Sequence, residues 1–429
     1  MATACVVGGH PAGIGQTSHK TSRILDQPHL QTMTPSTLPA ALAGTRILDL
    51  SRILAGPSAT QLLGDLGADV VKVEKPGEGD DTRKWGPPYV MDPTGHPTQE
   101  SAYYLCANRN KRSIAVDLNN ADGLELLHQL IERADVLVEN FKVGDLARYG
   151  LAYDQIKDRY PRLIYCSITG FGQTGPYSKR PGYDFLIQAM GGIMSLTGDA
   201  DGQPSKVGVG IADVMTGMYA AVGILAALQH RNATGLGQHI DVSLLDTQVA
   251  WLVNAGTNYL MDRKLPARLG NGHPNIVPYQ VFDTADAPII LAIGNDMQFR
   301  RFCASAGVPD LVDDPRFASN PMRVANREQV CARVQEMLKL RTRSDWLREL
   351  EAVGVPCGPV NNLEDVFSDP QVKARGAVLR MACEWSLEGE LELLANPLKM
   401  SASPPSYRRP PPRLNEHESQ VLADWLPQI

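Results

Sequence analysis

The stretch RILDLSRILAGPSATQLLGDLGADVVKVE, residues 46–74, decides the fold. Its opening, Arg46–Leu50, has the apolar composition of a strand. Gly56-Pro57 closes a turn, and proline suits the first turn of the helix that we expect over Ser58–Leu66. Asp69–Glu74 is the next strand. A strand, a short helix and a second strand predict a parallel pair joined by a crossover.

The same alternation continues downstream. A helical face is predicted by apolar residues at helical spacing, namely Leu124, Leu127, Leu130 and Ile131. Apolar strands follow at Val136–Val138 and Leu163–Ile168. Repeated strand–helix units predict an α/β fold with a large doubly wound, Rossmann-like domain.

A nearly wholly apolar helix is predicted from Ile211 to Gln229. Such a helix is expected to be buried on all sides, with Gly217 and Gly223 permitting close packing. Beyond His239–Leu244 the alternation loosens. We expect a smaller α+β part there, with strands at Val277–Phe282 and Ile289–Ile293 and helices near 297–306, 327–338 and 344–353.

The end of the chain carries two local signals. Pro404–Pro412 is proline-rich and predicts an extended tether. Asn415, with Glu418 three residues later, has the spacing of a capping box and predicts the start of a last helix.

Composition narrows the class of protein. The chain has 429 residues, 43% hydrophobic and 21% charged, with a formal net charge of −6, so we expect two domains and neither nucleic acid nor a membrane as partner. No apolar run was expected to reach the ~20 residues that span a bilayer. The seven cysteines are scattered, without metal-ligand spacing, which indicates a reducing, cytoplasmic setting and no metal site.

The first residues lack the basic-then-apolar plan of a secretory signal. We expect residues 1–40 to be a disordered or spurious extension with Met33 as the true start, and an organelle-targeting segment is the alternative.

Several ligand motifs are absent. The first strand–helix turn, Ser51–Pro57, has no GxGxxG, so a nicotinamide dehydrogenase is disfavoured, and neither a P-loop nor a GxSxG elbow occurs. Basic residues near predicted strand ends are either a solvated surface or a site for a phosphate-rich ligand: Lys72, Lys75, Arg83, Lys84, Arg109, Lys111, Arg112, Lys142 and Arg148. The glycine-rich loops Gly170–Gly182 and Leu269–Pro274 suit plain turns or a site that opens and closes.

Asp213 is the most informative single residue. It lies where the apolar helix begins, after Gly208 and Gly210, and there it meets the positive end of the helix dipole. A helix N-cap is the structural interpretation, and an ionised, partly desolvated nucleophile is the functional one.

The sequence resembles the family III CoA-transferases, the group of formyl-CoA transferase and carnitine CoA-transferase. The resemblance runs from about Leu42 to the end of the chain and rests on ordered segments that include NKRSIAVDL, ADVLVENF, GPYSKRPGYDFLIQAMGG, GIADVMTGMYAAVGILAAL, TGLGQHIDVSLLD and GNGHPNIVPYQVF. It implies a large CoA-binding domain formed by 41–245 and 376–429, a small domain with linkers over 246–375, and an interlocked homodimer.

The resemblance also implies site residues. Asp213 takes the place of the family's nucleophile, and Asp184 matches an acidic position beside it. Coenzyme A, as substrate and product rather than a tightly bound cofactor, is expected to contact Arg52, Leu54, Ala55, Lys75, Val116, Asn140, Phe141, Arg148, Tyr149 and Tyr183. Relatives often carry His and Gln where this chain has Arg52 and Leu54, and Lys75 replaces an Arg, which keeps the charge but loses a bidentate fork.

The expected activity is CoA transfer from an acyl-CoA, with succinyl-CoA or another dicarboxylyl-CoA favoured, to a carboxylic acid through a covalent aspartyl intermediate. Arg52 is expected to favour a second carboxylate. The alternative within the same fold is an α-methylacyl-CoA racemase, but its GHD segment is Gly182-Tyr183-Asp184 here, and tyrosine is a poor base at neutral pH. A CoA-binding protein without catalysis is a further alternative, which the retained Asp213 disfavours.

Overall fold

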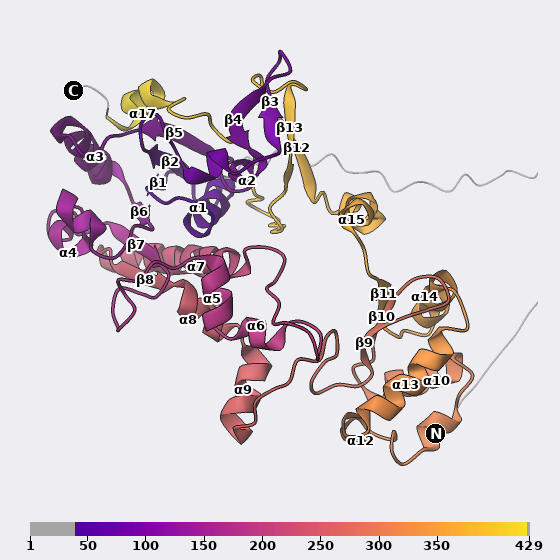
Figure 1. Ribbon diagram of the computed structural model, residues 1–429. Coiled ribbons are helices and arrows are strands. Elements are labelled where there is room, and N and C mark those ends of the chain that lie inside the picture. The colour runs from indigo at the N-terminus through magenta and orange to yellow at the C-terminus, as the bar shows by residue number, and fades with distance from the viewer. Residues whose placement is uncertain (1–38, 427–429) are drawn as a thin grey trace, which may run out of the picture. The chain divides into compact units, whose positions relative to one another are not determined.

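The computed structural model describes residues 39–426 (Figure 1). The expectations for Met33 and for almost all of the segment 1–40 therefore lie outside the described residues.

A six-stranded sheet forms the centre of the N-terminal half. Its strands are β1 (Arg46–Asp49), β2 (Asp69–Glu74), β5 (Lys111–Ala115), β6 (Val136–Glu139), β7 (Ile164–Thr169) and β8 (His239–Ser243). Every neighbouring pair is parallel, and the order is β5-β2-β1-β6-β7-β8. Counted along the chain this is the order 3-2-1-4-5-6, which is the Rossmann arrangement. The predicted parallel α/β sheet is confirmed.

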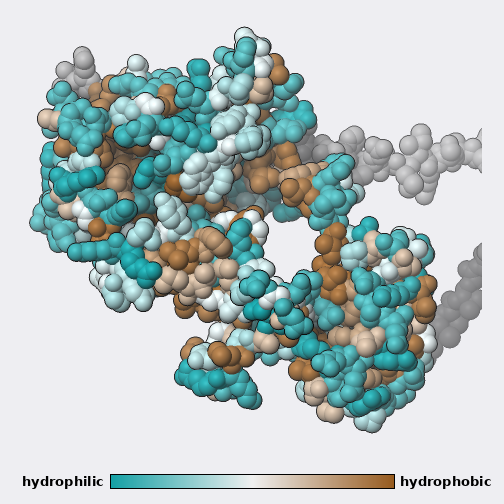
Figure 2. All heavy atoms as spheres, viewed as in Figure 1, coloured by the Kyte–Doolittle hydropathy of each residue, from teal (hydrophilic) through white to brown (hydrophobic). Residues whose placement is uncertain are grey.

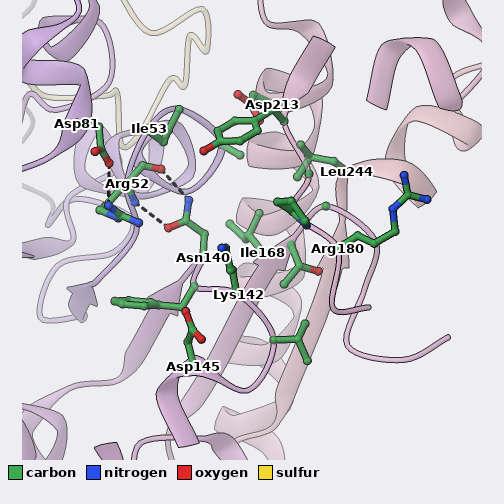
Figure 3. Close-up of a pocket in the computed structure, with 18 of the residues that line it drawn as sticks. Arg52, Ile53, Asp81, Asn140, Lys142, Asp145, Ile168, Arg180, Asp213 and Leu244 are labelled. Atoms are coloured by element: carbon green, nitrogen blue, oxygen red, sulfur yellow. Dashed lines mark hydrogen bonds and ion pairs between the residues drawn. The ribbon is translucent and has the colours of Figure 1, made fainter. Parts of the chain in front are cut away.

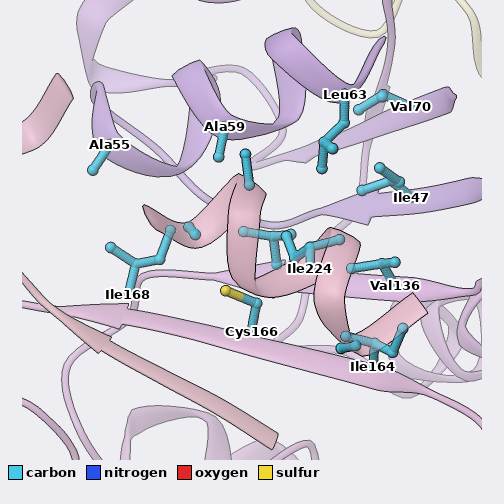
Figure 4. Close-up of a cluster of buried hydrophobic side chains, with 14 of the residues drawn as sticks. Ile47, Ala55, Ala59, Leu63, Val70, Val136, Ile164, Cys166, Ile168 and Ile224 are labelled. Carbon is cyan, nitrogen blue, oxygen red and sulfur yellow. The ribbon is translucent and has the colours of Figure 1, made fainter. Parts of the chain in front are cut away.

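Helices cover both faces of this sheet because its strands present apolar side chains in alternation. Ile47 points to one face and Leu48 to the other. The first face packs against α1 (Ala55–Asp65), α5 (Asp184–Met190), α7 (Ile211–Thr234) and α8 (Leu244–Ala250), and Figure 4 shows this core. The second face packs against η2 (Asp145–Tyr149), α3 (Ala121–Arg133), α4 (Tyr153–Ile156) and α17 (Glu418–Trp425).

Helices α1 and α7 approach each other closely, as the glycines of α7 predict. A Cβ on Gly217 would lie 2.6 Å from the carbonyl oxygen of Ala55, a distance that real side chains do not adopt. Gly217 therefore lets the start of α1 touch α7, and this contact lies directly beside Asp213 on the same helix.

The expectation that α7 is buried on all sides is wrong. Its inner stripe lies in the core, but an outer stripe is exposed, formed by Met218, Tyr219, Val222 and Leu225. No other element of residues 39–426 covers that stripe, because only one side of α7 faces the sheet. The helix is also 24 residues long and apolar enough to cross a membrane by length and composition, contrary to the expectation, and half of its most apolar window is buried within the protein.

A second core lies in the C-terminal half. The antiparallel strands β9 (Tyr279–Phe282), β10 (Ile289–Ala292) and β11 (Cys357–Pro359) pack against α10 (Asp296–Ser305), α13 (Arg327–Leu338) and α14 (Arg343–Ala352). A smaller cluster joins α2 (Ala102–Leu105), β3 (Tyr89–Met91) and β4 (Pro97–Ser101) to the hairpin β12 (Val378–Ala382) and β13 (Glu390–Leu394). The domain limits 41–245, 246–375 and 376–429 stay a prediction.

The remaining elements are short. They are η1 (Asp81–Lys84), α6 (Ile193–Leu196), α9 (Val253–Asp262), α11 (Asp310–Asp313), α12 (Asn320–Ala325), α15 (Leu363–Ser368) and α16 (Pro370–Ala374).

The proline-rich segment 404–412 is extended, but it is bound along its length. Ser406 donates its amide to the Asp65 carbonyl, and Arg409 accepts from the Asn110 amide at 2.9 Å. The predicted start of the last helix at Asn415 is wrong. Asn415 has a positive φ of 59° and its side chain accepts from the Ala115 amide, so the helix begins only at Glu418.

Candidate active site

A cavity of about 320 Å³ lies at the carboxyl ends of β1 and β6, where the strand order reverses. Open α/β sheets bind ligands at this switch point. We call it the Asp213 cavity (Figure 3); its lining comprises Arg52, Ile53, Ala55, Asp81, Trp85, Asn140, Phe141, Lys142, Val143, Asp145, Ile168, Thr169, Gly170, Ser178, Arg180, Pro181, Gly182, Tyr183, Asp213 and Leu244. The loop Gly170–Gly182 contributes to this lining, whereas Leu269–Pro274 does not.

The turn after β1 is strained and held from two sides. Ile53 has a φ of 73°, which is costly for a β-branched residue. The Asn140 side chain bonds both backbone polar groups of Arg52, accepting from its amide at 2.9 Å and donating to its carbonyl at 2.7 Å. Asp80 accepts from the Ile53 amide at 3.2 Å. Strain that is held in this way fixes the wall of the cavity before a ligand arrives.

Beneath the turn lies a buried network of charges. Lys72 pairs with Asp80 at 2.8 Å, and Lys111 pairs with Asp49 at 3.0 Å, all four side chains being fully buried. Burial alone would raise the pKa of Asp80, but the charge and hydrogen bond of Lys72 outweigh it and lower that pKa to about 2. Burial also lowers the pKa of Lys111 to about 8, against the attraction of Asp49.

Most of the basic residues near strand ends belong to this framework. Arg109 pairs with Asp65 at 2.5 Å and Arg112 with Asp69 at 2.5 Å, and both guanidinium groups are buried. Arg83 likewise pairs with Glu74 at 2.7 Å. Carboxylates thus neutralise five of these basic residues, which are neither a solvated surface nor a phosphate site: Lys72, Arg83, Arg109, Lys111 and Arg112.

Asp213 is the third residue of α7 and not its cap. The residue before the helix, Gly210, offers no side chain, and Asp184 supplies the cap from α5 by accepting the Ala212 amide at 2.8 Å. The Asp213 carboxyl is half-buried. Burial, and next the negative charge of Asp184, raise its pKa to about 7. The expected partial desolvation is present, but the carboxyl is not held ionised as expected, because desolvation exceeds the help of the helix dipole.

Tyr103 and Trp85 lie near this carboxyl. Burial, and then the charge of Asp213, raise the pKa of Tyr103 to about 12, so its hydroxyl stays protonated. The Trp85 ring packs edge-on against Tyr103 with the ring centroids 5.2 Å apart. Sequence reasoning missed both residues, because they lie outside the strand ends that it searched.

A second cavity of about 330 Å³ adjoins the first. We call it the Lys75 cavity, and its lining includes Leu50, Arg52, Val73, Glu74, Lys75, Gly79, Asp80, Val116, Asp117, Leu118, Asn119, Phe141, Asp145, Arg148 and Tyr149. It shares Arg52, Phe141 and Asp145 with the Asp213 cavity.

The two cavities bring most of the predicted ligand contacts together. Arg52, Ala55, Asn140, Phe141, Tyr183 and Asp213 line the first, and Arg52, Lys75, Val116, Phe141, Arg148 and Tyr149 line the second. Leu54 lines neither, because it is buried against the start of α7 near Gly210. Thr169 was not predicted as a contact, although it directly follows a predicted strand, which is the signal that finds it, and Lys142 was predicted only as one of the basic residues that could hold a phosphate-rich ligand.

Among residues 39–426, no group of three or more His, Cys, Asp or Glu side chains is placed to hold a metal ion. Taken together, the parallel sheet and the cavities at its switch point, one of them lined by the half-buried carboxyl of Asp213, are typical of an α/β enzyme that binds a ligand at this edge of the sheet.

Comparison with known proteins identifies the enzyme family. The model of CoA-transferase family III matches residues 42–418. Succinate–glutarate CoA-transferase of Agrobacterium fabrum is 50% identical over 384 residues, covering 89% of this chain and 95% of the relative. Human succinyl-CoA:glutarate CoA-transferase is 44% identical, covering 90% and 86%. The crystal structure of a CaiB/BaiF family protein from Brucella suis superposes with a TM-score of 0.79 at 47% identity, covering 90% and 100%.

The chain therefore belongs to CoA-transferase family III and is a CoA-transferase. The resemblance found in the sequence is confirmed.

Proposed function

We propose that this enzyme moves CoA from succinyl-CoA or another dicarboxylyl-CoA to a carboxylic acid through a covalent intermediate on Asp213. The observation that carries the proposal is a half-buried carboxyl in the switch-point cavity, next to the start of α1 and without an ion pair among residues 39–426. The substrate class is supported by the relatives, several of which are named for succinyl-CoA.

The chemistry needs a carboxylate and no base. The Asp213 carboxylate attacks the thioester carbonyl of the donor, which forms a mixed anhydride and expels CoA thiolate. The thiolate attacks the aspartyl carbonyl of that anhydride, which releases the donor acid and leaves an aspartyl-CoA thioester. The acceptor carboxylate then attacks this thioester, which forms a second anhydride and again expels CoA thiolate. The thiolate attacks the acceptor's acyl carbonyl, which releases the new acyl-CoA and restores the Asp213 carboxylate.

The raised pKa of Asp213 suits this cycle. A desolvated carboxylate is a stronger nucleophile than a solvated one, and a pKa of about 7 leaves roughly half of the groups ionised at neutral pH. We therefore expect the rate of the first half-reaction to rise with pH up to about 7 and then to level off.

The Lys75 cavity is assigned to the nucleotide end of CoA. Lys75 and Arg148 offer exposed cations for phosphates, while Val116, Phe141 and Tyr149 offer apolar surface for a base. Ala55, Asn140 and Tyr183 line the way to Asp213 and are assigned to the pantetheine and thioester end, with Leu54 behind them.

The acyl end needs a cation if the acid has a second carboxylate. Arg52, the residue expected for this role, already pairs with Asp81 at 2.8 Å. The Lys142 side chain points toward the middle of the cavity (Figure 3), and no ion pair is recorded for it in the described part of the chain. We therefore include Lys142 with Arg52 as contacts of the distal carboxylate.

A covalent trap tests the proposal. With succinyl-CoA alone, hydroxylamine should convert Asp213 to a hydroxamate that peptide mass spectrometry locates. Asp213→Asn keeps size but loses charge, so transfer should fall by about 10³-fold or more while folding persists. Transfer should fall much less in the matched variant Asp184→Asn, because Asp184 is assigned only a supporting role: it caps α7, and its charge acts on the Asp213 carboxyl. Near-normal transfer by Asp213→Asn, or a hydroxamate on Asp184, would contradict the assignment.

We also propose that the enzyme is a homodimer with interlocked chains. Its support is the exposed apolar surface of α7 together with that of α5, where Figure 2 shows hydrophobic side chains at the surface, and of α9, which buries no residue. Differently labelled dimers mixed under native conditions should exchange no subunits over hours, because separating linked chains requires unfolding. Rapid exchange would exclude interlocking.

A further inference from the structure

A cluster of titratable side chains lies on the second face of the sheet, directly behind the site. Glu139, Ser167 and Asp241 stand side by side on β6, β7 and β8, paired in register. His239 precedes Asp241 by two residues on β8, and its Nε2 is 2.9 Å from the Ser167 Oγ. None of these residues contributes to the transfer mechanism described above.

The cluster lines a third cavity, of about 320 Å³, that reaches the site. Glu139, Tyr153, Tyr165, Ser167 and His239 form its inner wall. The cavity shares its outer wall with the Asp213 cavity, through Phe141, Lys142 and Val143. The same short segment after β6 therefore separates the cluster from the proposed substrate.

Glu139 is joined to that segment by a hydrogen bond. Its Oε2 accepts from the Phe141 amide at 2.8 Å, and its side chain is 5% exposed. The residue between them, Asn140, holds both backbone polar groups of Arg52. A continuous path thus runs from the Glu139 carboxyl through the turn 140–141 to the strained turn at Ile53.

We propose that Glu139 is a positioning residue for the CoA site: its carboxylate fixes the Phe141 amide and thereby the turn that clamps Arg52. This inference rests on the proposed function only in that CoA is taken as the ligand of the two cavities.

The surroundings of Glu139 make this support dependent on pH. Burial raises the pKa of Glu139 to about 7, against the hydrogen bonds of Ser167 and the Phe141 amide, and the charge of Asp241 adds to the rise. Burial also lowers the pKa of His239, so its ring is neutral near pH 7. Other titratable groups near the carboxyl or along the cavity are Tyr153, Asp154, Tyr165, Cys166 and Lys142.

The direction of the pH effect follows from the hydrogen bond between the Phe141 amide and Glu139. The ionised carboxylate is the stronger acceptor for the Phe141 amide, so the turn is fixed above pH 7 and loosened below it. A ligand that needs the fixed turn must bind more tightly as the pH rises through about 7. We expect CoA to bind about fivefold more tightly at pH 8 than at pH 6 from this cause, the ratio between a charged and a neutral hydrogen bond.

Binding of CoA itself, without turnover, tests the inference. The full-length Asp213→Asn enzyme is titrated with CoA by calorimetry at pH 6 and pH 8, which removes the titration of Asp213. In the double variant with Glu139→Gln, residue 139 keeps an oxygen that can accept the Phe141 amide but no longer titrates. The fivefold difference in CoA affinity between pH 6 and pH 8 should therefore disappear, and only the change due to the phosphates of CoA should remain. Asp154→Asn is the control, since Asp154 lines the same cavity but is largely exposed and pairs with Lys157.

The outcomes separate the two proposals. Equal pH dependence with and without Glu139→Gln would overturn the positioning role and leave CoA transfer untouched. Absence of CoA binding at either pH would overturn the proposed function and this inference with it. In the unsubstituted enzyme, exchange of the Phe141 amide, corrected for its intrinsic pH dependence, should be about fivefold better protected at pH 8 than at pH 6; equal protection would also overturn the inference.

Discussion

The charges beneath the turn after β1 and the carboxyl of Asp213 in the adjoining cavity are all ionisable groups near one site, but their surroundings differ. Lys72, Asp80, Lys111 and Asp49 are fully buried, and each has a partner within 3.0 Å. Asp213 is only half-buried, and the charge that acts on it most is the like charge of Asp184. A buried charge with an opposite partner stabilises the fold. A buried charge without such a partner has a higher energy and stays available for reaction.

The largest effect should come from breaking a buried pair. Lys72→Met leaves Asp80 buried without its partner, which should lower the free energy of unfolding by about 3–5 kcal/mol. Urea unfolding at pH 7 measures the change. Arg380→Met, in the exposed pairs with Glu390 and Glu392, is the control and should change it by less than about 1 kcal/mol. If both variants lost the same free energy of unfolding, the buried pair would contribute no more to stability than the exposed pairs.

Replacing Asp213, in contrast, should increase the stability of the fold, and the increase should grow with pH. Its pKa of about 7 in the folded state exceeds its ordinary value of 3.8, so the folded state binds more protons between these values and loses stability as the pH rises through this window. Asp213→Asn removes this loss. The free energy of unfolding of the variant, relative to that of the parent enzyme, should therefore increase by about 1–3 kcal/mol between pH 4 and pH 8. A constant difference across the range would show that Asp213 is not strained by its burial.

Removing the exposed cations of the Lys75 cavity should weaken the binding of CoA esters without destabilising the fold. Arg148→Ala should raise KM about tenfold for every CoA ester alike, because a charge-assisted bond to phosphate is lost. Lys75→Ala should act in the same direction, and less, because Lys75 already pairs with Glu78 at 2.6 Å. Steady-state kinetics with succinyl-CoA and acetyl-CoA compare the two. An effect confined to one acyl group would place the residue at the acyl end instead.

Arg52 should show the smallest effect. Its pair with Asp81 is about half exposed, so Arg52→Ala should change the free energy of unfolding by less than about 1 kcal/mol. If Arg52 also meets a distal carboxylate, the ratio of dicarboxylate to monocarboxylate turnover should fall about threefold or more, within the range of one exposed charged contact. An unchanged ratio would assign that role to Lys142 alone.

The local signals of the sequence were reliable where a strand or helix is decided by its own residues. The predicted strand Asp69–Glu74 and the helix over 327–338 have the bounds that the structure shows. The site residues came from the family resemblance, and most of them line the cavities at the switch point of the parallel sheet.

Properties that depend on distant partners were not predictable. Arg109, Lys111 and Arg112 looked like a basic patch because their carboxylates lie 43 to 62 residues away in the chain. The exposed stripe of α7 was missed because apolar composition does not distinguish a helix in the core from a helix with one exposed apolar side. The raised pKa of Asp213 depends first on its burial by the folded chain and then on the charge of Asp184, which lies on another helix.

The last helix has a consequence for how the protein is made. Helix α17 inserts Val421 and Trp425 into the core of the second face of the sheet, and the Trp425 indole donates to Asp69 at 2.8 Å. A ribosome therefore releases β5, the strand that α17 contacts, about 300 residues before α17 itself. A premature stop between residues 243 and 421 would leave all six strands in the chain but remove α17, so the part of the second face that α17 covers would stay open, while η2, α3 and α4 could still cover the rest.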